Sequence, residues 1–114
     1  MEIKTDDYSV RYDEATATIS CAGSLRLSGM EEYAPILEML NNAAEQQAEQ
    51  LNLDLRNLEF LNSSGINVLS KFVIHVRQRK SPQINVKGST KIPWQSKSLK
   101  NLQRLLPTLE LSFE

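Results

Sequence analysis

Residues 51–66, LNLDLRNLEFLNSSGI, contain the pattern that decides the fold class. Leu51, Leu53 and Leu55 alternate with polar residues, and this period of two predicts a short β-strand with one buried face. The polar residues 62–65 follow, and an apolar stripe at helical spacing begins at Ile66. A hydroxyl residue can cap such a helix, and glycine removes side-chain bulk beside the turn. The segment therefore predicts a strand, a tight loop and a helix.

An amphipathic helix is predicted before this segment, from about Ser28 to about Gln47. Ser28 is its expected N-cap, and Glu31, three residues later, completes a capping box. Pro35 lies inside the stretch, and an interior proline removes a helix hydrogen bond. We therefore expect the regular helix to begin nearer Glu32.

Two more helices follow the central segment. The stripe from Ile66 to Val76 predicts a helix that ends near Arg79, with Leu69 and Val73 buried against the sheet. His75 lies opposite Ile66 on this helix and is expected to be exposed. Residues 89–96 are expected to form a loop, and leucines at helical spacing over residues 99–106 predict the third helix.

Four further strands complete the pattern. Residues 8–12 and 17–22 alternate apolar with polar side chains around a polar break, which predicts an antiparallel hairpin. Residues 84–86 and 109–113 predict two short strands. The predicted order is β-β-α-β-α-β-α-β, so strands and helices alternate after the hairpin. This predicts an α/β fold with a mixed, mostly parallel sheet and helices mainly on one face.

The composition is that of one globular domain over residues 1–114, with 40% hydrophobic residues. A single Cys excludes an internal disulfide framework, and with one His it excludes a His/Cys metal cluster. Cys21 lies on the apolar side of its strand and is expected to be a buried structural thiol. Neither a membrane-spanning run nor a signal-peptide pattern is present, so we expect a cytoplasmic protein.

Charge is distributed unevenly along the chain. Residues 1–59 contain 12 acidic and 4 basic side chains, whereas residues 60–114 contain 9 basic and 2 acidic ones. Both parts also contain periodic apolar residues, so a folded domain with an acidic and a basic side is expected. The basic side is either a solvated helix surface or a docking surface for an acidic partner. Trp94 is the only Trp or Tyr side chain among residues 60–114, which disfavours nucleic-acid binding.

Nearly the whole chain resembles the STAS domain family, the fold of bacterial anti-sigma-factor antagonists. The resemblance depends on residues 53–55, 60–66 and 23–25. In that family an aliphatic-Asp-aliphatic strand leads to an Asp-Ser-Ser/Thr-Gly-aliphatic loop at the start of a helix. A partner serine kinase phosphorylates the first serine of the loop, and by position that residue is Ser63.

Two residues depart from the family pattern. Asn62 stands where the family usually has Asp, and Arg26 stands where it often has Asp after Gly-x-Leu. The amide of Asn62 keeps the shape and the acceptor oxygen of Asp but loses the charge. If the kinase recognises that charge, phosphorylation of Ser63 is weaker, and Asn62→Asp should raise its rate. Asp caps helices about as well as Asn, so this change is expected to leave the fold intact.

The resemblance implies a protein-interaction switch and not an enzyme. A serine kinase or anti-sigma-type protein would bind a loop made of Asn62, Ser63, Ser64 and Gly65, together with Arg26. Phosphorylation of Ser63 would control the contact and a phosphatase would reset it. A monomer is expected, without cofactor, metal, nucleic-acid or membrane partner.

Two other functions stay open. One is a constitutive adaptor that uses the same surface without being phosphorylated. The other is a small-ligand or nucleotide-binding domain that uses the loop as an anion cradle. The loop lacks a glycine-rich phosphate fingerprint with a lysine, which disfavours this last function.

Overall fold

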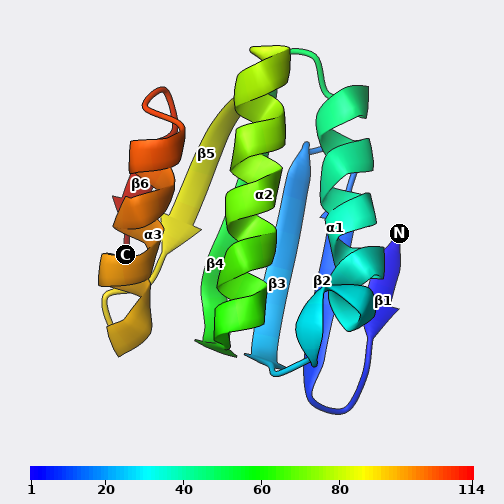
Figure 1. Ribbon diagram of the computed structural model, residues 1–114, viewed down its shortest axis with the longest axis vertical. Helices are drawn as coiled ribbons and strands as arrows, with labels where there is room; N and C mark the ends of the chain where they lie inside the picture. Colours follow the sequence, from blue (N-terminus) through cyan, green and yellow to red (C-terminus); the bar gives the residue numbers. More distant parts are fainter.

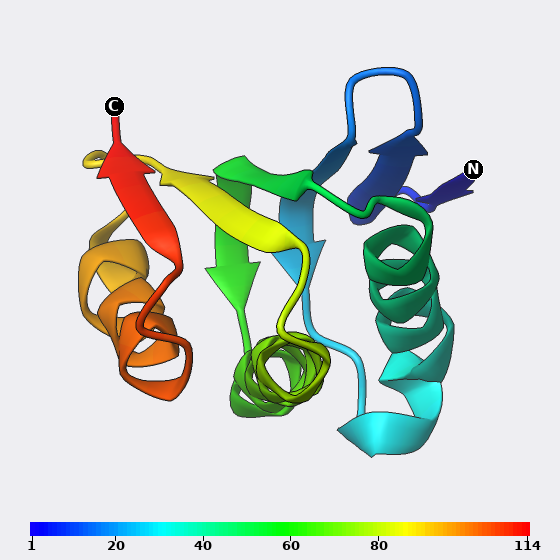
Figure 2. The same ribbon diagram turned by 90° about the horizontal axis from the view of Figure 1, so that it is seen from above.

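A computed structural model describes residues 1–114 as a six-stranded sheet with three helices packed on one face (Figure 1, Figure 2). The elements are β1 Glu2–Lys4, β2 Tyr8–Asp13, β3 Thr18–Leu25, α1 Gly29–Gln46, β4 Gln50–Leu61, α2 Ser63–Arg79, β5 Gln83–Gly88, α3 Pro93–Leu105 and β6 Glu110–Phe113. Seen from above in Figure 2, the helices lie in one layer below the sheet, and no helix covers its other face. The predicted α/β class and one-sided helix layer are confirmed.

The strands are arranged in chain order across the sheet, from β1 to β6. β1, β2 and β3 pair antiparallel, and β3, β4, β5 and β6 pair parallel. The predicted hairpin and mostly parallel sheet are therefore confirmed. Strand β1 was not predicted. It has three residues and only Ile3 faces the core, which is too short for a periodic pattern.

The core lies between the sheet and the helix layer, and α2 is at its centre (Figure 1). Leu69, Phe72, Val73 and Val76 are buried on α2, as the helical stripe predicted. The alternating leucines of β4 face the helices, and the polar side chains between them face the open side of the sheet. None of the three helices is both long and apolar enough to cross a membrane.

Strand β4 is longer than predicted and continues to Leu61. Its register with β3 shifts twice: Ser20 pairs with Asp54 but Ala22 with Asn57, and Gly23 pairs with Leu58 but Ser24 with Phe60. Each shift adds one residue to β4, as in a β-bulge. Buried leucines therefore recur after three residues at positions 55, 58 and 61 instead of after two. This broken alternation explains why the sequence pattern ended the strand at Leu55.

Helix α1 is continuous from Gly29, so the expectation that it begins nearer Glu32 is wrong. Pro35 lies inside it without ending it. The predicted capping box is also wrong, because the Ser28 side chain makes no capping hydrogen bond. Instead the backbone N–H of Ser28 donates to Oε1 of Glu32 at 3.0 Å. The first turn is thus closed by a side chain four residues later, not by Glu31.

Helix α3 begins at Pro93, inside the stretch that was expected to be a loop. Proline fits the first helical position, because it needs no hydrogen-bond acceptor there and its φ is suited to the helix. The first turn also contains Gln95, which is fully buried. This turn has no buried apolar side chain that a sequence pattern could reveal, since its buried side chain is polar.

Cys21 is buried, as expected, and burial together with the nearby charge of Asp54 raises its pKa to about 12. A thiol with this pKa stays protonated at neutral pH and is a structural group. His75 differs from expectation: it is half-buried, and it borders a hollow on the side of α2 that faces α1.

Candidate functional site

The loop of residues 62–65 lies where the carboxyl end of β4 meets the amino end of α2. Asn62 is the N-cap of α2 and Ser63 is its first residue. Ser63 is exposed, Ser64 is half-buried and Gly65 is buried. The first turn of α2 contains no acidic side chain. An anion on Ser63 would therefore lie beside the positive end of the helix dipole with no nearby acid on that turn.

The side chain of Asn62 fixes the position of this loop. Its Oδ1 accepts hydrogen bonds from the Gly65 N–H at 3.0 Å and from the Tyr33 hydroxyl at 2.6 Å. Its Nδ2 donates to the carbonyl of Leu27 at 2.8 Å. One side chain thus connects the start of α2, the helix α1 and the segment that follows β3.

These contacts correct one expectation from the sequence. An Asp at position 62 would keep the acceptor for Gly65 and Tyr33, but its ionised carboxylate cannot donate to Leu27. The exchange of Asn for Asp is therefore not structurally neutral here. These hydrogen bonds also disfavour the anion-cradle function, because the Gly65 N–H already donates to Asn62 and is not free to bind a ligand.

Gly65 and Tyr33 pack closely beside Asn62. A Cβ added to Gly65 would collide with Cδ1 of Leu61 and would lie 2.8 Å from the Tyr33 hydroxyl oxygen. Glycine is therefore required by close packing at this position, not by an unusual φ. Tyr33 is 1% exposed, and burial raises its pKa, so its hydroxyl is a stable donor to Asn62.

Arg26 lies beside the same loop. The two residues that flank it both contact Asn62: the carbonyl of Leu25 accepts from the backbone N–H, and that of Leu27 accepts from the side chain. The guanidinium of Arg26 stacks on the ring of Phe60, with Cζ 4.6 Å from the ring centroid. Phe60 is 39% exposed, which is unusual for a large apolar side chain in this protein.

The structure therefore brings together all five residues that the sequence indicated, which are Asn62, Ser63, Ser64, Gly65 and Arg26. Sequence reasoning missed Tyr33 and Phe60 as parts of the same site. Tyr33 belongs to the apolar stripe of α1, where a core role explains it fully. Phe60 follows the second register shift of β4 and lies between the buried residues Leu58 and Leu61, so its ring is outside the core.

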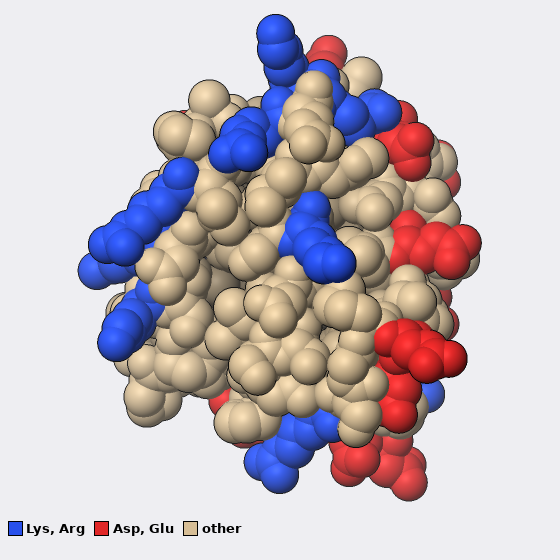
Figure 3. Space-filling model, viewed as in Figure 1, with Lys and Arg blue, Asp and Glu red and all other residues tan.

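Acidic and basic side chains, which are unevenly distributed along the chain, are also unevenly distributed over the surface of the protein (Figure 3). On the helix side, acidic side chains gather over α1, and Lys and Arg side chains lie mainly over α2 and α3. Trp94, the ring considered for base stacking, is half-buried, and its indole N–H donates to the Glu59 carbonyl at 3.0 Å.

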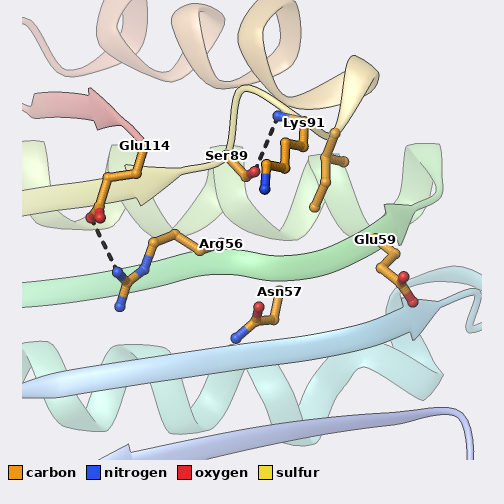
Figure 4. Close-up of a pocket in the computed structure, with 7 residues that line it drawn as sticks. Arg56, Asn57, Glu59, Ser89, Lys91 and Glu114 are labelled. Carbon is orange, nitrogen blue, oxygen red and sulfur yellow. Dashed lines mark hydrogen bonds and ion pairs between the residues drawn. The ribbon is translucent and has the colours of Figure 1, made fainter.

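A second polar region lies where β4 separates from β5 (Figure 4). An open hollow there is lined by Arg56, Asn57, Glu59, Ser89, Lys91, Ile92 and Glu114. Arg56 bonds to Asp54 at 2.8 Å and to Glu114 at 3.1 Å, so it is held by two carboxylates. No residue of the Asn62–Gly65 loop lines this hollow, and its mixed charge favours no single class of ligand.

Asp54 gives a testable pH dependence. The hydrogen bond from Arg56 holds the pKa of this carboxyl below its ordinary value. The native protein thus binds fewer protons at Asp54 than the unfolded chain, so stability is fully present above about pH 4 and is lost as pH falls through the lower native pKa. Asp54→Asn should flatten the fall in unfolding midpoint between about pH 5 and pH 2, measured by urea titration.

Asp6→Asn is the matched control, because Asp6 is exposed and takes part in none of the ion pairs. If the wild type and Asp54→Asn lose stability in parallel on acidification, the Asp54–Arg56 pair has no effect on the stability of the protein at acid pH.

Comparison with known proteins supports the fold. No protein-family model matches the sequence, and no curated protein matches it in a sequence search. Three solved structures from Pseudomonas aeruginosa match nearly the whole chain. One is a chain of the complex of the diguanylate cyclase SiaD with its activator SiaC, with a TM-score of 0.73 and 13% identity over 100% of this chain and 99% of that chain.

The other two are structures of SiaC. One has a TM-score of 0.69 and 14% identity, and covers 99% of this chain and 93% of the SiaC chain. The second, apo-SiaC, has a TM-score of 0.73 and 11% identity, and covers 100% of this chain and 98% of that chain. At these identities the match establishes the fold. The chain therefore has the same fold as SiaC, and this fold is consistent with the STAS-like resemblance of the sequence.

Proposed function

We propose that this chain is a protein-interaction regulator in which phosphorylation of Ser63 controls the contact with a partner. The observation that carries the proposal is the placement of Ser63, which is exposed at the first position of α2 on a loop fixed by Asn62. A kinase can reach such a hydroxyl, and the helix N-terminus tolerates the added charge. The fold need not change, so the effect falls on the docking surface.

In this proposal the chain is a kinase substrate and not an enzyme. Its partner is a serine kinase or anti-sigma-type protein, and a phosphatase removes the phosphate. The shared fold with SiaC adds support for a regulator that acts through protein contacts, since SiaC is described as the activator of a diguanylate cyclase. By the same analogy the regulated partner can be an enzyme instead of an anti-sigma factor.

The test compares partner binding by wild-type protein, Ser63→Ala and Ser63→Asp, with phosphosite mapping of the wild type. Ser63→Asp is expected to weaken the contact at least about tenfold, equal to 1.4 kcal/mol, because a fixed anion now lies at the contact. Ser63→Ala should keep it. Asn67→Asp is the matched control, since Asn67 is exposed on the same helix one turn later.

A constitutive adaptor is the second candidate, and Asn62 favours it, because the charge that a kinase would recognise is missing. In that case one partner binds all three Ser63 variants equally and no phosphate is found. A partner lost equally with Ser63→Ala and with Asn67→Asp would contradict both candidates.

A further prediction separates the two candidates. If the missing charge limits the kinase, Asn62→Asp should raise the rate of Ser63 phosphorylation by the cognate kinase. Rates are measured at equal protein concentration in a time course, with phosphate located by mass spectrometry. Because Asp cannot donate to Leu27, circular dichroism and a denaturant titration must first show that the variant is folded. Equal rates in the two folded proteins would show that the charge is not recognised.

A further inference from the structure

Arg26 is a positively charged residue at the edge of the proposed site. It is exposed and belongs to none of the three ion pairs of the protein. Its guanidinium contacts the ring of Phe60, an exposed cation–π contact that water and salt weaken. Asp7 lines the same shallow hollow as Arg26 without forming an ion pair with it. The side chain is therefore available for a stronger partner.

The pairing of β3 with β4 brings the backbone of Arg26 close to that of Ser63. β3 and β4 end side by side, with Leu25 paired to Leu61, and Arg26 and Asn62 directly follow the paired residues. Neighbouring strands lie about 4.8 Å apart, so the backbone of Arg26 is close to that of Asn62 and of Ser63, the next residue. The bonds from Asn62 to Leu25 and Leu27 hold the two segments together on both sides of Arg26.

We propose that Arg26 is the receiving side chain for a phosphate on Ser63: on phosphorylation its guanidinium leaves the Phe60 ring, pairs with the phosphate and uncovers that ring. A guanidinium forms two parallel hydrogen bonds to a phosphate, and this pair is stronger than an exposed contact with an aromatic face. The modification would then change two features of the surface together. It would neutralise part of the new charge, and it would present an aromatic side chain of a kind that is enriched at protein interfaces.

The inference rests on the proposed function only in taking Ser63 as the phosphate acceptor. The test therefore places phosphoserine at position 63 of the full chain during translation, so that no kinase or partner is needed. A ³¹P NMR titration gives the second pKa of the phosphate in the wild type and in Arg26→Gln. Since a nearby cation favours the dianion, that pKa should be lower in the wild type by at least about 0.3 unit.

Arg11→Gln is the matched control, because it removes an exposed arginine from β2 without touching the loop. The chemical shifts of the Arg26 δ-methylene protons provide a second readout. Stacked on Phe60 they are displaced by the ring current, and this displacement should disappear on phosphorylation. Equal phosphate pKa values in the wild type and Arg26→Gln, or an equal change in Arg11→Gln, would overturn the role of Arg26 and leave the Ser63 switch itself untouched.

Discussion

Replacing Gln95 with methionine should lower the free energy of unfolding by about 3–5 kcal/mol. Gln95 is fully buried and satisfies three backbone groups at once. Its Oε1 accepts from the Ser89 N–H at 2.7 Å, and its Nε2 donates to the carbonyls of Leu55 and Leu58 at 2.7 and 3.0 Å. Methionine has a similar length but offers neither a comparable donor nor a strong acceptor, so all three groups lose their partners.

The position of these carbonyls explains why the loss is large. β5 pairs with β4 only over residues 50–54, so the later part of β4 has no neighbouring strand on that side. The first turn of α3 takes the place of a strand there, through Gln95 and through the bond from Trp94 to Glu59. A buried carbonyl without a partner costs about 1–3 kcal/mol.

A urea titration of the wild type, Gln95→Met and Gln78→Met measures this effect. Gln78 is exposed on α2, so its replacement should change stability by no more than about 0.5 kcal/mol. If Gln95→Met lowers the free energy of unfolding by less than about 1 kcal/mol, the Gln95 side chain does not satisfy the carbonyls on the unpaired edge of β4.

Phe72→Ala should destabilise the protein by about 3–5 kcal/mol. Phe72 is 1% exposed and is among the largest fully buried side chains of the core. Phe72 lies on α2, the helix between α1 and α3 (Figure 1), and its removal leaves a cavity in the core between the helices and the sheet. The cost combines the lost burial of the ring with the incomplete collapse of the cavity.

Lys71→Ala is the control for this change, since Lys71 is the exposed neighbour on the same helix. Both variants are compared with the wild type by denaturant titration. A Phe72→Ala protein as stable as Lys71→Ala would show that α2 presents a different face to the sheet, which would also displace Ser63 from its present position.

Local sequence patterns were sufficient for the elements that bury one apolar face. The stripe of α2 correctly placed Leu69 and Val73 in the core, and the alternation of residues 17–22 correctly placed Cys21 there. In these segments one periodic signal determines both the type of element and its buried side. The loop that begins at Asn62 was also located from the sequence, because a polar run between a strand and a helix leaves few other arrangements.

Prediction from the sequence failed where the apolar pattern of an element is interrupted or where its buried residue is polar. Two added residues broke the alternation of β4, so its second half was not assigned to a strand. The start of α3 was missed because its buried residue is Gln95, whose role appears only once Leu55 and Leu58, 40 and 37 positions away, are in contact with it. β1 was missed because three residues are too few to show a period.

By itself, then, the sequence determined the α/β class, the buried faces of most elements and the place of Ser63 at the start of a helix. Tertiary structure alone decided how Asn62 joins Tyr33 and Leu27, residues 29 and 35 positions away, and how Arg26 meets the exposed ring of Phe60. The physical reason is that periodicity records which side of an element is apolar. A polar contact between distant residues leaves no period, and it exists only when the packed sheet and helices bring those residues together.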